Sequence, residues 1–445
     1  MNRPSALVRL LVSVVLAVTL VSCRSIVSMG NLPKPDLVVA ADGSGDFKTI
    51  QSAVASIART NTERLVVFIK DGTYHEKIRV DASYVTLRGQ SRKGTRIEFP
   101  QLDEDFNKTP DTIGRAVINL NQADDFVLAS LTVENTAGEI GPHAFTILGS
   151  GDRAVVVNCD VLSHGADTVS FWRGDQGRYY QANCRMEGSV DFVCPRGWCY
   201  VTNCSFYEWK DTAAVWHDGS RDKDMKFVLR DCRFDGTNGW NLARHHHDAQ
   251  FYFLDCRFSR TMTNQPPFRV VYPLDGGTPT ASDIQRNKDL DASNLWGERS
   301  YFYDCHRQGG DYAWFADNLS TAPGSPAPGQ INAAWTFGGT WNPESTTGPA
   351  IQKVSRQDGR VMLTFNGSVT VKGRPRLALS DGSFADYASG RGSDTLAFNL
   401  PKGRTKIVTS VDLNGGAIIA SEAGTTMRPA QLTLPVDIAG QRPVR

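Results

Sequence analysis

Seven short segments of the chain repeat one pattern, a stretch of β-branched and aromatic residues followed by one small apolar side chain. The residues at this position are Leu131, Cys159, Cys184, Cys204, Cys232, Cys256 and Cys305. Successive members are 28, 25, 20, 28, 24 and 49 residues apart, and the last step is about twice 24. A strand repeated at a nearly constant period of this size is typical of a solenoid in which each coil adds one rung.

The repeated segments lack the long 3.6-residue pattern of helical repeats, and Gly, Asn and Asp separate them. We therefore predict an all-β chain built on a right-handed parallel β-helix. The six cysteines would stack inside it as small hydrophobic side chains. Neighbouring rungs lie ~4.8 Å apart, so disulfides between them are possible but not required. Cys194 and Cys199 fall outside this register, and whether they pair stays open.

The segment from Met1 to Cys23 resembles a bacterial lipoprotein signal. Arg3 and Arg9 precede an apolar run from Leu10 to Val21, which is shorter than the ~20 residues that a membrane span needs. Cys23 ends the segment and is the expected lipidation site, so we expect an exported protein held at the cell envelope by a lipid anchor. A plain secretory signal with a chance cysteine is the alternative. Residues 24–36 then form a tether.

Composition shifts along the chain suggest two domains. Residues 37–344 form the predicted β-helix, which begins with a strand, a Gly-rich turn and a helix near residue 50. Residues 261–295 are rich in Pro, Asp and Asn and are expected to extend from one face as an insertion. The stretch 321–330 reads as a loop or wrapping tail. Residues 345–445 show short strands with turns every 8–12 residues and are expected to form a β-sandwich accessory domain.

The overall charge limits the partners that the chain can have. The formal net charge of +1 argues against a surface built for nucleic acid. The Gly-rich turn at 43–46 lacks the Lys-Ser/Thr ending of a phosphate loop. We expect a monomer without a nucleic-acid partner.

Two aspartates lie at nearly equal distances after cysteines of the repeat. Asp167 is eight residues after Cys159, Asp191 is seven after Cys184, and the interval between the two aspartates matches one repeat. One coil apart, their carboxylates would lie ~5 Å from each other. Two carboxylates that close do not ionise equally, which supplies an acid and a nucleophile or base. Asp211 is also seven residues after a cysteine, so spacing alone selects three aspartates.

Arg244, twelve residues after Cys232, is a candidate to keep one carboxylate ionised through a bidentate contact. His245, His246 and His247 follow it directly. Side chains alternate along a strand, so three consecutive histidines do not converge on one metal ion. The sequence therefore favours a wall of a substrate cleft here over a metal site.

Several stretches resemble the pectin methylesterase family of carbohydrate esterases. They are VAADGSGDFKTIQSAV at 39–54, DGTYHEKI at 71–78, ENTAG at 134–138, ADTV at 166–169, GSVDFV at 188–193 and LAR at 242–244. The resemblance spans about residues 37–344, with the motifs in the order of the family. It implies a parallel β-helix that removes methyl esters from galacturonate units of pectin or a related polygalacturonate, without a metal or organic cofactor.

The resemblance also implies a role for each residue of the trio. Asp191 would be the nucleophile. Asp167 would be the acid that protonates the leaving methanol and then the base that activates water. Arg244 would orient Asp191 and keep it ionised.

The chain departs from the family at positions around this site. Two glutamines of the family, which stabilise the oxyanion, are Ala166 and His143 here. His246 stands in place of a tryptophan, and Pro195 in place of a glycine. Losing one oxyanion donor typically costs ~3 kcal/mol of transition-state stabilisation.

Aromatic and basic residues near the motifs are candidates for binding sugar rings and their carboxylates. Sugar rings stack on aromatic surfaces, and we expect substrate contacts from His143, Trp172, Trp198 and His246. Further aromatic candidates are Tyr179, Trp216 and Trp240, and the basic candidates are Arg173, Arg178, Arg196 and Arg221. Packing in the core or at the rim is the equal alternative for each aromatic residue.

Three functions remain open at the level of the sequence. The first is hydrolysis of pectin methyl esters. The second is another β-helix enzyme, a polysaccharide hydrolase or lyase, because carboxylates ~5 Å apart also suit a retaining glycosidase. The third is a pectin-binding homologue without activity, which the loss of both glutamines suggests.

Overall fold

The computed structural model describes residues 36–443 apart from 175–176, 218–221, 275, 345–348, 350, 380–382, 402–406, 415, 421–432 and 438–441. The predicted signal at 1–23 with Cys23, and nearly all of the tether at 24–36, lie outside the described residues.

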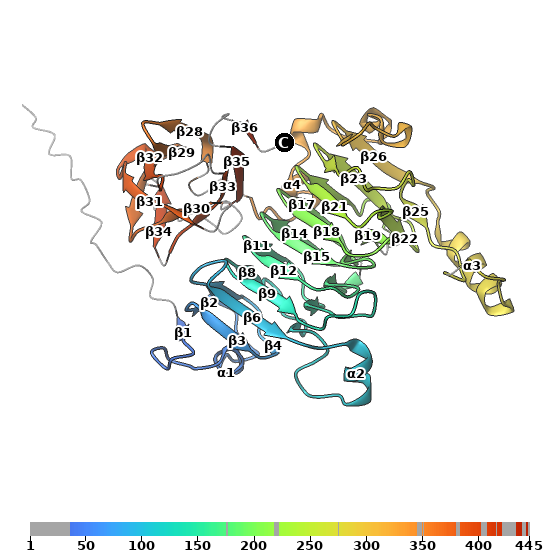
Figure 1. Ribbon diagram of the computed structural model, residues 1–445, viewed down its shortest axis with the longest axis horizontal. Helices are drawn as coiled ribbons and strands as arrows, with labels where there is room; N and C mark the ends of the chain where they lie inside the picture. The colour runs from blue at the N-terminus through green and yellow to red at the C-terminus, as the bar shows by residue number, and fades with distance from the viewer. Residues whose placement is uncertain are drawn as a thin grey trace, which may run out of the picture.

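Three parallel sheets, here called A, B and C, form the elongated body of the molecule (Figure 1). Sheet A contains β1 (Leu37–Val39), β2 (Leu65–Ile69), β5 (Val85–Gly89), β8 (Val127–Ala129), β11 (Ala154–Val157), β14 (Arg178–Ala182), β17 (Trp198–Thr202), β20 (Phe227–Arg230), β23 (Gln250–Leu254) and β26 (Arg299–Tyr303). Sheet B contains β3 (Gly72–His75), β6 (Thr95–Phe99), β9 (Thr132–Asn135), β12 (Asp160–Leu162), β15 (Arg185–Gly188), β18 (Ser205–Glu208), β21 (Arg233–Gly236), β24 (Arg257–Phe258) and β27 (His306–Arg307). Sheet C contains β4 (Ile78–Val80), β7 (Ile118–Leu120), β10 (Ile147–Gly149), β13 (Val169–Phe171), β16 (Val193–Pro195), β19 (Ala213–His217), β22 (Asn241–His245) and β25 (Phe268–Arg269). The predicted parallel β-helix is confirmed.

One coil differs from the sequence-based expectation. The long step between Cys256 and Cys305 is one coil, not two, because β23 pairs directly with β26 and β24 with β27. The segment at 261–295 does contain a piece of the coil pattern, the two-residue strand β25 that pairs with β22. The rest of the extra length forms the arm that carries α3 (Ala281–Ser293).

The six ladder cysteines lie inside the coil, as the period predicts. Each is buried, and each has a free thiol. The residue before each cysteine has a left-handed backbone, for example Asn158 with φ 55° and Asn183 with φ 53°. Asn and Asp adopt this conformation more readily than most residues. These two asparagines also bond to each other through their side chains at 3.1 Å, so the corner between sheets A and B repeats in register.

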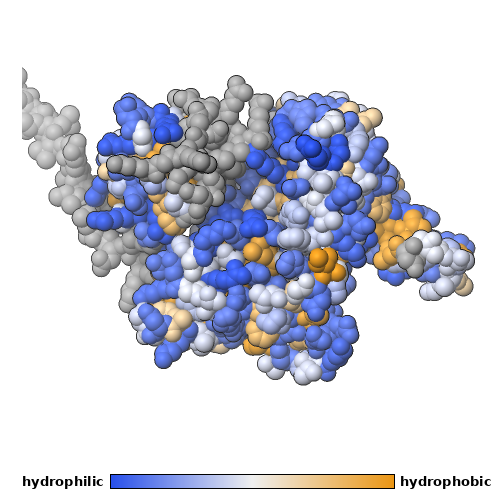
Figure 2. Space-filling model, viewed as in Figure 1, coloured by the Kyte–Doolittle hydropathy of each residue, from blue (hydrophilic) through white to orange (hydrophobic). Residues whose placement is uncertain are grey.

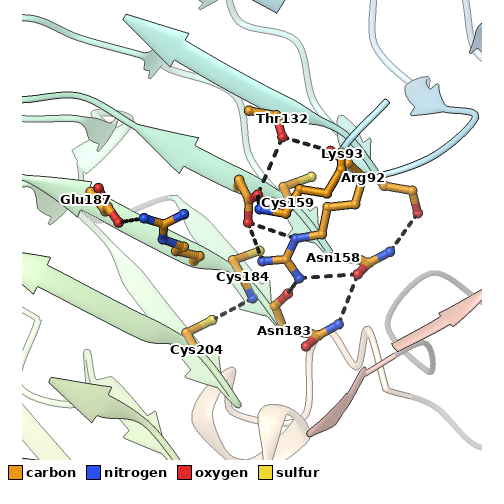
Figure 3. Close-up of polar contacts among 12 residues, drawn as sticks. Arg92, Lys93, Thr132, Asn158, Cys159, Asn183, Cys184, Glu187 and Cys204 are labelled. Atoms are coloured by element: carbon orange, nitrogen blue, oxygen red, sulfur yellow. Dashed lines mark hydrogen bonds and ion pairs between the residues drawn. The ribbon is translucent and has the colours of Figure 1, made fainter. Parts of the chain in front are cut away.

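A buried ion pair clamps this corner (Figure 3). Arg92 and Lys93, from the loop before β6, both bind Asp160 at the start of β12. Arg92 also donates to the Asn183 carbonyl at 2.9 Å. The Asp160 side chain is only 2 % exposed, so its charge depends on these partners.

Short elements close the open ends of the β-helix. At the N-terminal end lies α1 (Ile50–Ala55), capped by the Thr49 side chain, which buries Ile50, Ala53 and Val54 in the core. This confirms the helix predicted near residue 50. At the other end, Phe315 in the 3-10 turn Ala313–Phe315 packs on Phe258 and Phe302.

The outer face of sheet A is covered by the segment after β27. It contains the turns Leu319–Thr321 and Pro328–Gln330 and the helix α4 (Ala333–Thr336). Its apolar residues pack on outward-facing residues of sheet A such as Tyr180 and Tyr252. The stretch 321–330, expected to be a loop or wrapping tail, is part of this cover.

Two elements project from the β-helix, α2 (Asp103–Lys108) and α3 (Figure 1). The arm around α3 exposes four large apolar side chains, which are Val271, Leu274, Ile284 and Leu295. Figure 2 shows hydrophobic surface where this arm leaves the body. Across the part of the chain that the structure describes, no helix is long and apolar enough to cross a membrane.

The C-terminal part is an antiparallel sheet around its own core, which confirms the all-β prediction for this part of the chain. Its strands are β28 (Ile351–Gln357), β29 (Arg360–Lys372), β30 (Arg376–Leu379), β31 (Phe384–Ser389), β32 (Ser393–Asn399), β33 (Ile407–Asp412), β34 (Ala417–Ala420), β35 (Thr433–Asp437) and β36 (Arg442–Pro443). The long strand β29 pairs with β28, β32 and β34.

Candidate active site

The two aspartates of the predicted pair occupy the same position on neighbouring rungs of sheet C. Asp167 lies two residues before β13 and Asp191 two residues before β16, and Val169 pairs with Val193. Adjacent parallel strands are ~4.8 Å apart, so both carboxyl groups belong to one site. Both aspartates have a left-handed backbone with φ 60°.

Main-chain hydrogen bonds to the following rungs hold both turns in place. The Asp167 amide donates to the Val190 carbonyl at 3.2 Å, and the Asp191 amide donates to the Ala213 carbonyl at 2.7 Å. The two side chains are largely buried, with 11 % of Asp167 and 9 % of Asp191 exposed. The main chain of the solenoid therefore holds both carboxyl groups in fixed positions with little exposure to solvent.

Arg244 binds Asp191 in a forked ion pair. Its Nε lies 2.8 Å from Oδ1 and 3.1 Å from Oδ2, and its Nη2 lies 2.6 Å from Oδ2. Arg244 belongs to β22, two rungs beyond β16, and reaches back across β19. A planar guanidinium that contacts both oxygens favours the ionised carboxylate and fixes its orientation.

The surroundings give the two carboxyl groups different pKa values. Burial, and then the charge of Asp191, raises the pKa of Asp167 well above its usual range. Burial also raises the pKa of Asp191, but the hydrogen bonds and charge of Arg244 oppose this, and the value is about 6. The surroundings therefore favour the protonated form of Asp167 and the ionised form of Asp191. A pair of this kind can supply a proton donor and a nucleophile.

Ala166 and His143, the positions at which the resemblance implies glutamines in the family, lie beside Asp167. Ala166 is buried and has no side-chain donor. His143 forms a parallel bridge with Ala166, and its Nε2 is 3.9 Å from Oδ2 of Asp167, too far for a direct hydrogen bond. Desolvation lowers the pKa of His143, so its ring is neutral at pH 7 and offers one N–H.

Phe145, Trp172 and Arg196 form the N-terminal wall of the site. Phe145 lies two residues before β10, the same offset at which Asp167 precedes β13. The Trp172 ring meets it edge-on at 5.5 Å, and the Arg196 guanidinium lies 4.3 Å from the centre of the Trp172 ring. Trp172, directly after β13, therefore folds back toward the carboxyl groups and carries a cation on its face.

Trp216, His246 and Tyr272 form the C-terminal wall. The rings of Trp216 and His246 are perpendicular at 4.3 Å, and Nε2 of His246 lies 2.6 Å from the Tyr272 hydroxyl. Burial, followed by the charge of Arg286, lowers the pKa of His246 to about 3. His246 is therefore neutral and links β22 to the α3 arm through Tyr272.

A pocket of about 410 Å³ continues from Trp172 toward the N-terminal coils. Its floor is the outer face of sheet C, where Asn119 of β7 pairs in register with Leu148 of β10. Arg79 and Arg115 also line it, and each forms an ion pair with an aspartate. Polar and aromatic groups therefore continue along one face from the carboxyl pair.

The three consecutive histidines do not converge. Nδ1 of His245 faces the His247 carbonyl at 2.8 Å, while Nδ1 of His247 faces the Ser293 hydroxyl at 2.8 Å. His246 faces Tyr272. Within the described part of the chain, no three His, Cys, Asp or Glu side chains are grouped as metal ligands.

Other candidate residues lie away from the carboxyl pair. Trp198 is on sheet A, where it packs with the cover of that sheet, and Nζ of Lys226 lies 4.8 Å from its ring and 4.8 Å from the Trp335 ring. Asp211 is exposed and lies two residues before Ala213, the residue in register with Asp191. Spacing from a cysteine therefore does not place Asp211 beside the pair.

The remaining candidates have structural partners or lie outside the described residues. Arg173 pairs with Asp124 and Arg178 with Asp152, Tyr179 and Trp240 are fully buried, and Arg221 is not among the described residues. Cys194 and Cys199 do not pair: both thiols are free. Cys199 faces the main core, whereas Cys194 packs with Trp216 on the outer face of sheet C.

Two residues of the walls were not anticipated from the sequence. Phe145 was detectable, because aligning its coil with the next two gives it the same offset from the strand as Asp167 and Asp191. Tyr272 had no such signal. It lies in the segment expected to be an insertion, and its contact with His246 depends on how the α3 arm folds.

A family model described as Pectinesterase matches residues 36–263. A pectinesterase from Petunia integrifolia is 32% identical over 185 residues, which are 41% of this chain and 47% of that protein. A probable pectinesterase/pectinesterase inhibitor from Arabidopsis thaliana is 32% identical over 272 residues, which are 59% of this chain and 47% of that protein. The chain thus spans less than half the length of these relatives.

Solved structures share the fold at lower sequence identity. A pectin methylesterase from Erwinia chrysanthemi superposes with a TM-score of 0.52 at 19% identity, over 69% of this chain and 98% of that one. A pectin methylesterase in complex with a hexasaccharide gives a TM-score of 0.53 at 20% identity, over 70% of this chain and 99% of that one. These similarities establish the shared β-helix fold.

Proposed function

Because this chain belongs to the Pectinesterase family, we propose that it hydrolyses methyl esters of galacturonate units in pectin and releases methanol. The observation that carries the proposal is the asymmetric carboxyl pair. The forked contact from Arg244 favours the ionised form of Asp191, while burial favours the protonated form of Asp167 on the preceding rung. An ester hydrolase that forms a covalent intermediate needs this combination of nucleophile and proton donor.

In the first step, an Oδ atom of Asp191 attacks the ester carbonyl carbon. A new carbon–oxygen bond forms, and the carbonyl π electrons move onto the carbonyl oxygen. The electrons then return, the bond to the methoxy group breaks, and Asp167 gives its proton to the leaving oxygen. Methanol departs and leaves an acyl anhydride on Asp191. Arg244 orients the attacking carboxylate.

In the second step, water replaces methanol. Asp167 is now a carboxylate and takes a proton from the water as that water attacks the acyl carbon. The anhydride bond breaks, the galacturonate carboxyl leaves, and Asp191 is again a carboxylate. Asp167 regains its proton, so one ester and one water give one acid and one methanol.

The substrate chain is proposed to lie along the outer face of sheet C. Trp172 and His246 border the reacting unit from opposite sides, and His143 lies beside the acid. The pocket between Trp172 and Arg79 accepts a neighbouring sugar unit. Trp198 is left out of this groove because it lies on sheet A.

Ala166 supports a second candidate function, binding of pectin without turnover. A buried alanine stands where an oxyanion donor is expected, and its methyl group donates no hydrogen bond. The site would then hold the polysaccharide through its walls alone.

One assay separates the candidates. The purified protein is incubated with highly methylated pectin, and methanol, chain length and binding are measured together. Methanol release at constant chain length supports the esterase. Chain shortening or unsaturated ends would instead indicate a glycosidase or lyase, and binding without products would indicate the non-catalytic homologue.

The placement of the protein in the cell is part of the proposal. The run Leu10–Val21 followed by Cys23 supports export and a lipid anchor at the cell envelope, with the β-helix at 37–344 acting as a monomer. The C-terminal unit at 345–445 is proposed as an accessory domain. Metabolic labelling with a fatty acid, lost in Cys23→Ala, tests the anchor.

A further inference from the structure

The proposed reaction places negative charge on the carbonyl oxygen, and neither Ala166 nor His143 beside Asp167 carries a side-chain amide that could stabilise this charge. Ala166 offers no donor. His143 offers one neutral ring N–H, on a side chain that is 57 % exposed. A charge that develops in a largely buried site needs a donor that is already in place.

Two of the contacts of Arg196 place it beside the site. Its backbone N–H donates to the Phe171 carbonyl at 2.7 Å, which fixes the turn after β16. Its guanidinium lies 4.3 Å from the centre of the Trp172 ring. Because Trp172 folds back onto Phe145, the cation is held over the outer face of sheet C and not extended into solvent.

The charge of Arg196 acts on the groups of the site. Burial and the charge of Asp191 raise the pKa of Asp167, and the charge of Arg196 opposes this increase. It also acts on Cys194 and His246, both of which lie beside Trp216. Arg244 contacts Asp191 through Nε and Nη2.

On the basis of the proposed ester hydrolysis, we infer that Arg196, held over Trp172, is a catalytic residue that stabilises the oxyanion in place of the missing amide donors. Its guanidinium donates a hydrogen bond to the carbonyl oxygen as Asp191 attacks and the π electrons move onto that oxygen. No proton is transferred, because a guanidinium keeps its protons. When the methoxy group leaves, the electrons return and the hydrogen bond weakens.

Kinetics of methanol release from methylated pectin test this inference with two substitutions. In Arg196→Ala, kcat is expected to fall about 10²–10³-fold while KM changes little, as for loss of one oxyanion donor. Arg173→Ala is the matched control. It removes an arginine from the turn after β13, where Arg173 pairs with Asp124, and it should keep the wild-type kcat.

Chemical rescue supplies a second readout. Millimolar guanidinium added to Arg196→Ala is expected to restore part of kcat, and to leave Arg173→Ala unchanged. Arg196→Lys, which keeps the charge and suits the case in which the alanine variant fails to fold, should fall between wild type and Arg196→Ala.

The outcomes distinguish the inference from the function on which it rests. Wild-type kcat in a folded Arg196→Ala or Arg196→Lys overturns the inference and leaves the esterase intact. A loss confined to KM also overturns it, and would instead make Arg196 a binding residue for a substrate carboxylate. Absence of methanol release by the wild-type protein refutes the proposed function itself, and the inference with it.

Discussion

Asp167 and Asp191 hold equivalent places on adjacent rungs of one sheet, yet their surroundings favour different protonation states. Val169 and Val193 fix the register, and the forked contact from Arg244 goes to Asp191. Burial alone would raise both pKa values. The arginine therefore distinguishes two otherwise similar carboxyl groups.

The pH dependence of kcat/KM should follow this separation. Activity is expected to rise through a pH of about 6 as Asp191 ionises, and to fall at high pH as Asp167 loses its proton. Methanol release is measured from pH 4 to 9, with the spontaneous hydrolysis of pectin subtracted at each pH. A flat profile across pH 6 would contradict the assignment of the nucleophile.

Replacing Arg244 should move the acid limb of this profile. In Arg244→Met, the pKa of Asp191 loses its opposing cation and rises further, so activity at pH 6 should drop more than activity at pH 8. Arg244→Lys keeps the charge but not the fork and should shift the limb less. An unshifted limb in both variants would show that Arg244 does not control Asp191.

Asp167→Asn should lose activity and gain stability. Without the proton donor, kcat is expected to fall about 10²–10⁴-fold. Because the pKa of Asp167 is raised in the folded protein, the wild type has its full stability below the unfolded pKa of about 4. It loses stability as the pH rises from this value through the folded pKa, since the unfolded chain releases the proton more easily. Asn remains neutral, so the stability difference in favour of the variant should grow above pH 4 and then level off.

Thermal unfolding at pH 4 and pH 8 measures this stability difference. A variant that is less stable than the wild type at both values would mean that Asp167 is ionised and paired in the folded protein.

The clamp at the corner of sheets A and B offers a test of the fold apart from the active site. Arg92→Met should lower the free energy of unfolding by about 3 kcal/mol, the lower end for breaking a buried ion pair, because Lys93 still faces Asp160. Lys93 is 59 % exposed, so Lys93→Met should cost less than about 1 kcal/mol. Equal losses in urea denaturation would contradict the ranking.

The sequence predicted the β-helix because each coil places one small apolar residue at the same inward position. The ladder from Cys159 to Cys305 made this visible without any knowledge of the turns between the strands. The last coil was misread because β25 has two residues, too few to show alternation, and lies next to the long α3 arm.

The aspartate pair was also predictable, because spacing along a solenoid translates into register. The residues that form the walls of the site were harder to predict from the sequence. Trp198 is close to Asp191 in sequence but faces outward from sheet A, while Tyr272 is distant in sequence and reaches His246 through the α3 arm. Which side chains fold back over a sheet depends on packing, as Trp172 shows with Phe145, and spacing does not encode it.

The most direct test of the central claim is methanol release by Asp191→Asn, with Asp211→Asn as the matched control. Asn keeps the shape of the side chain but is not a carboxylate nucleophile. We predict a loss on the order of 10⁴-fold or more for Asp191→Asn, with circular dichroism unchanged, and wild-type rates for the exposed Asp211→Asn. Full methanol release by a folded Asp191→Asn protein would contradict the account.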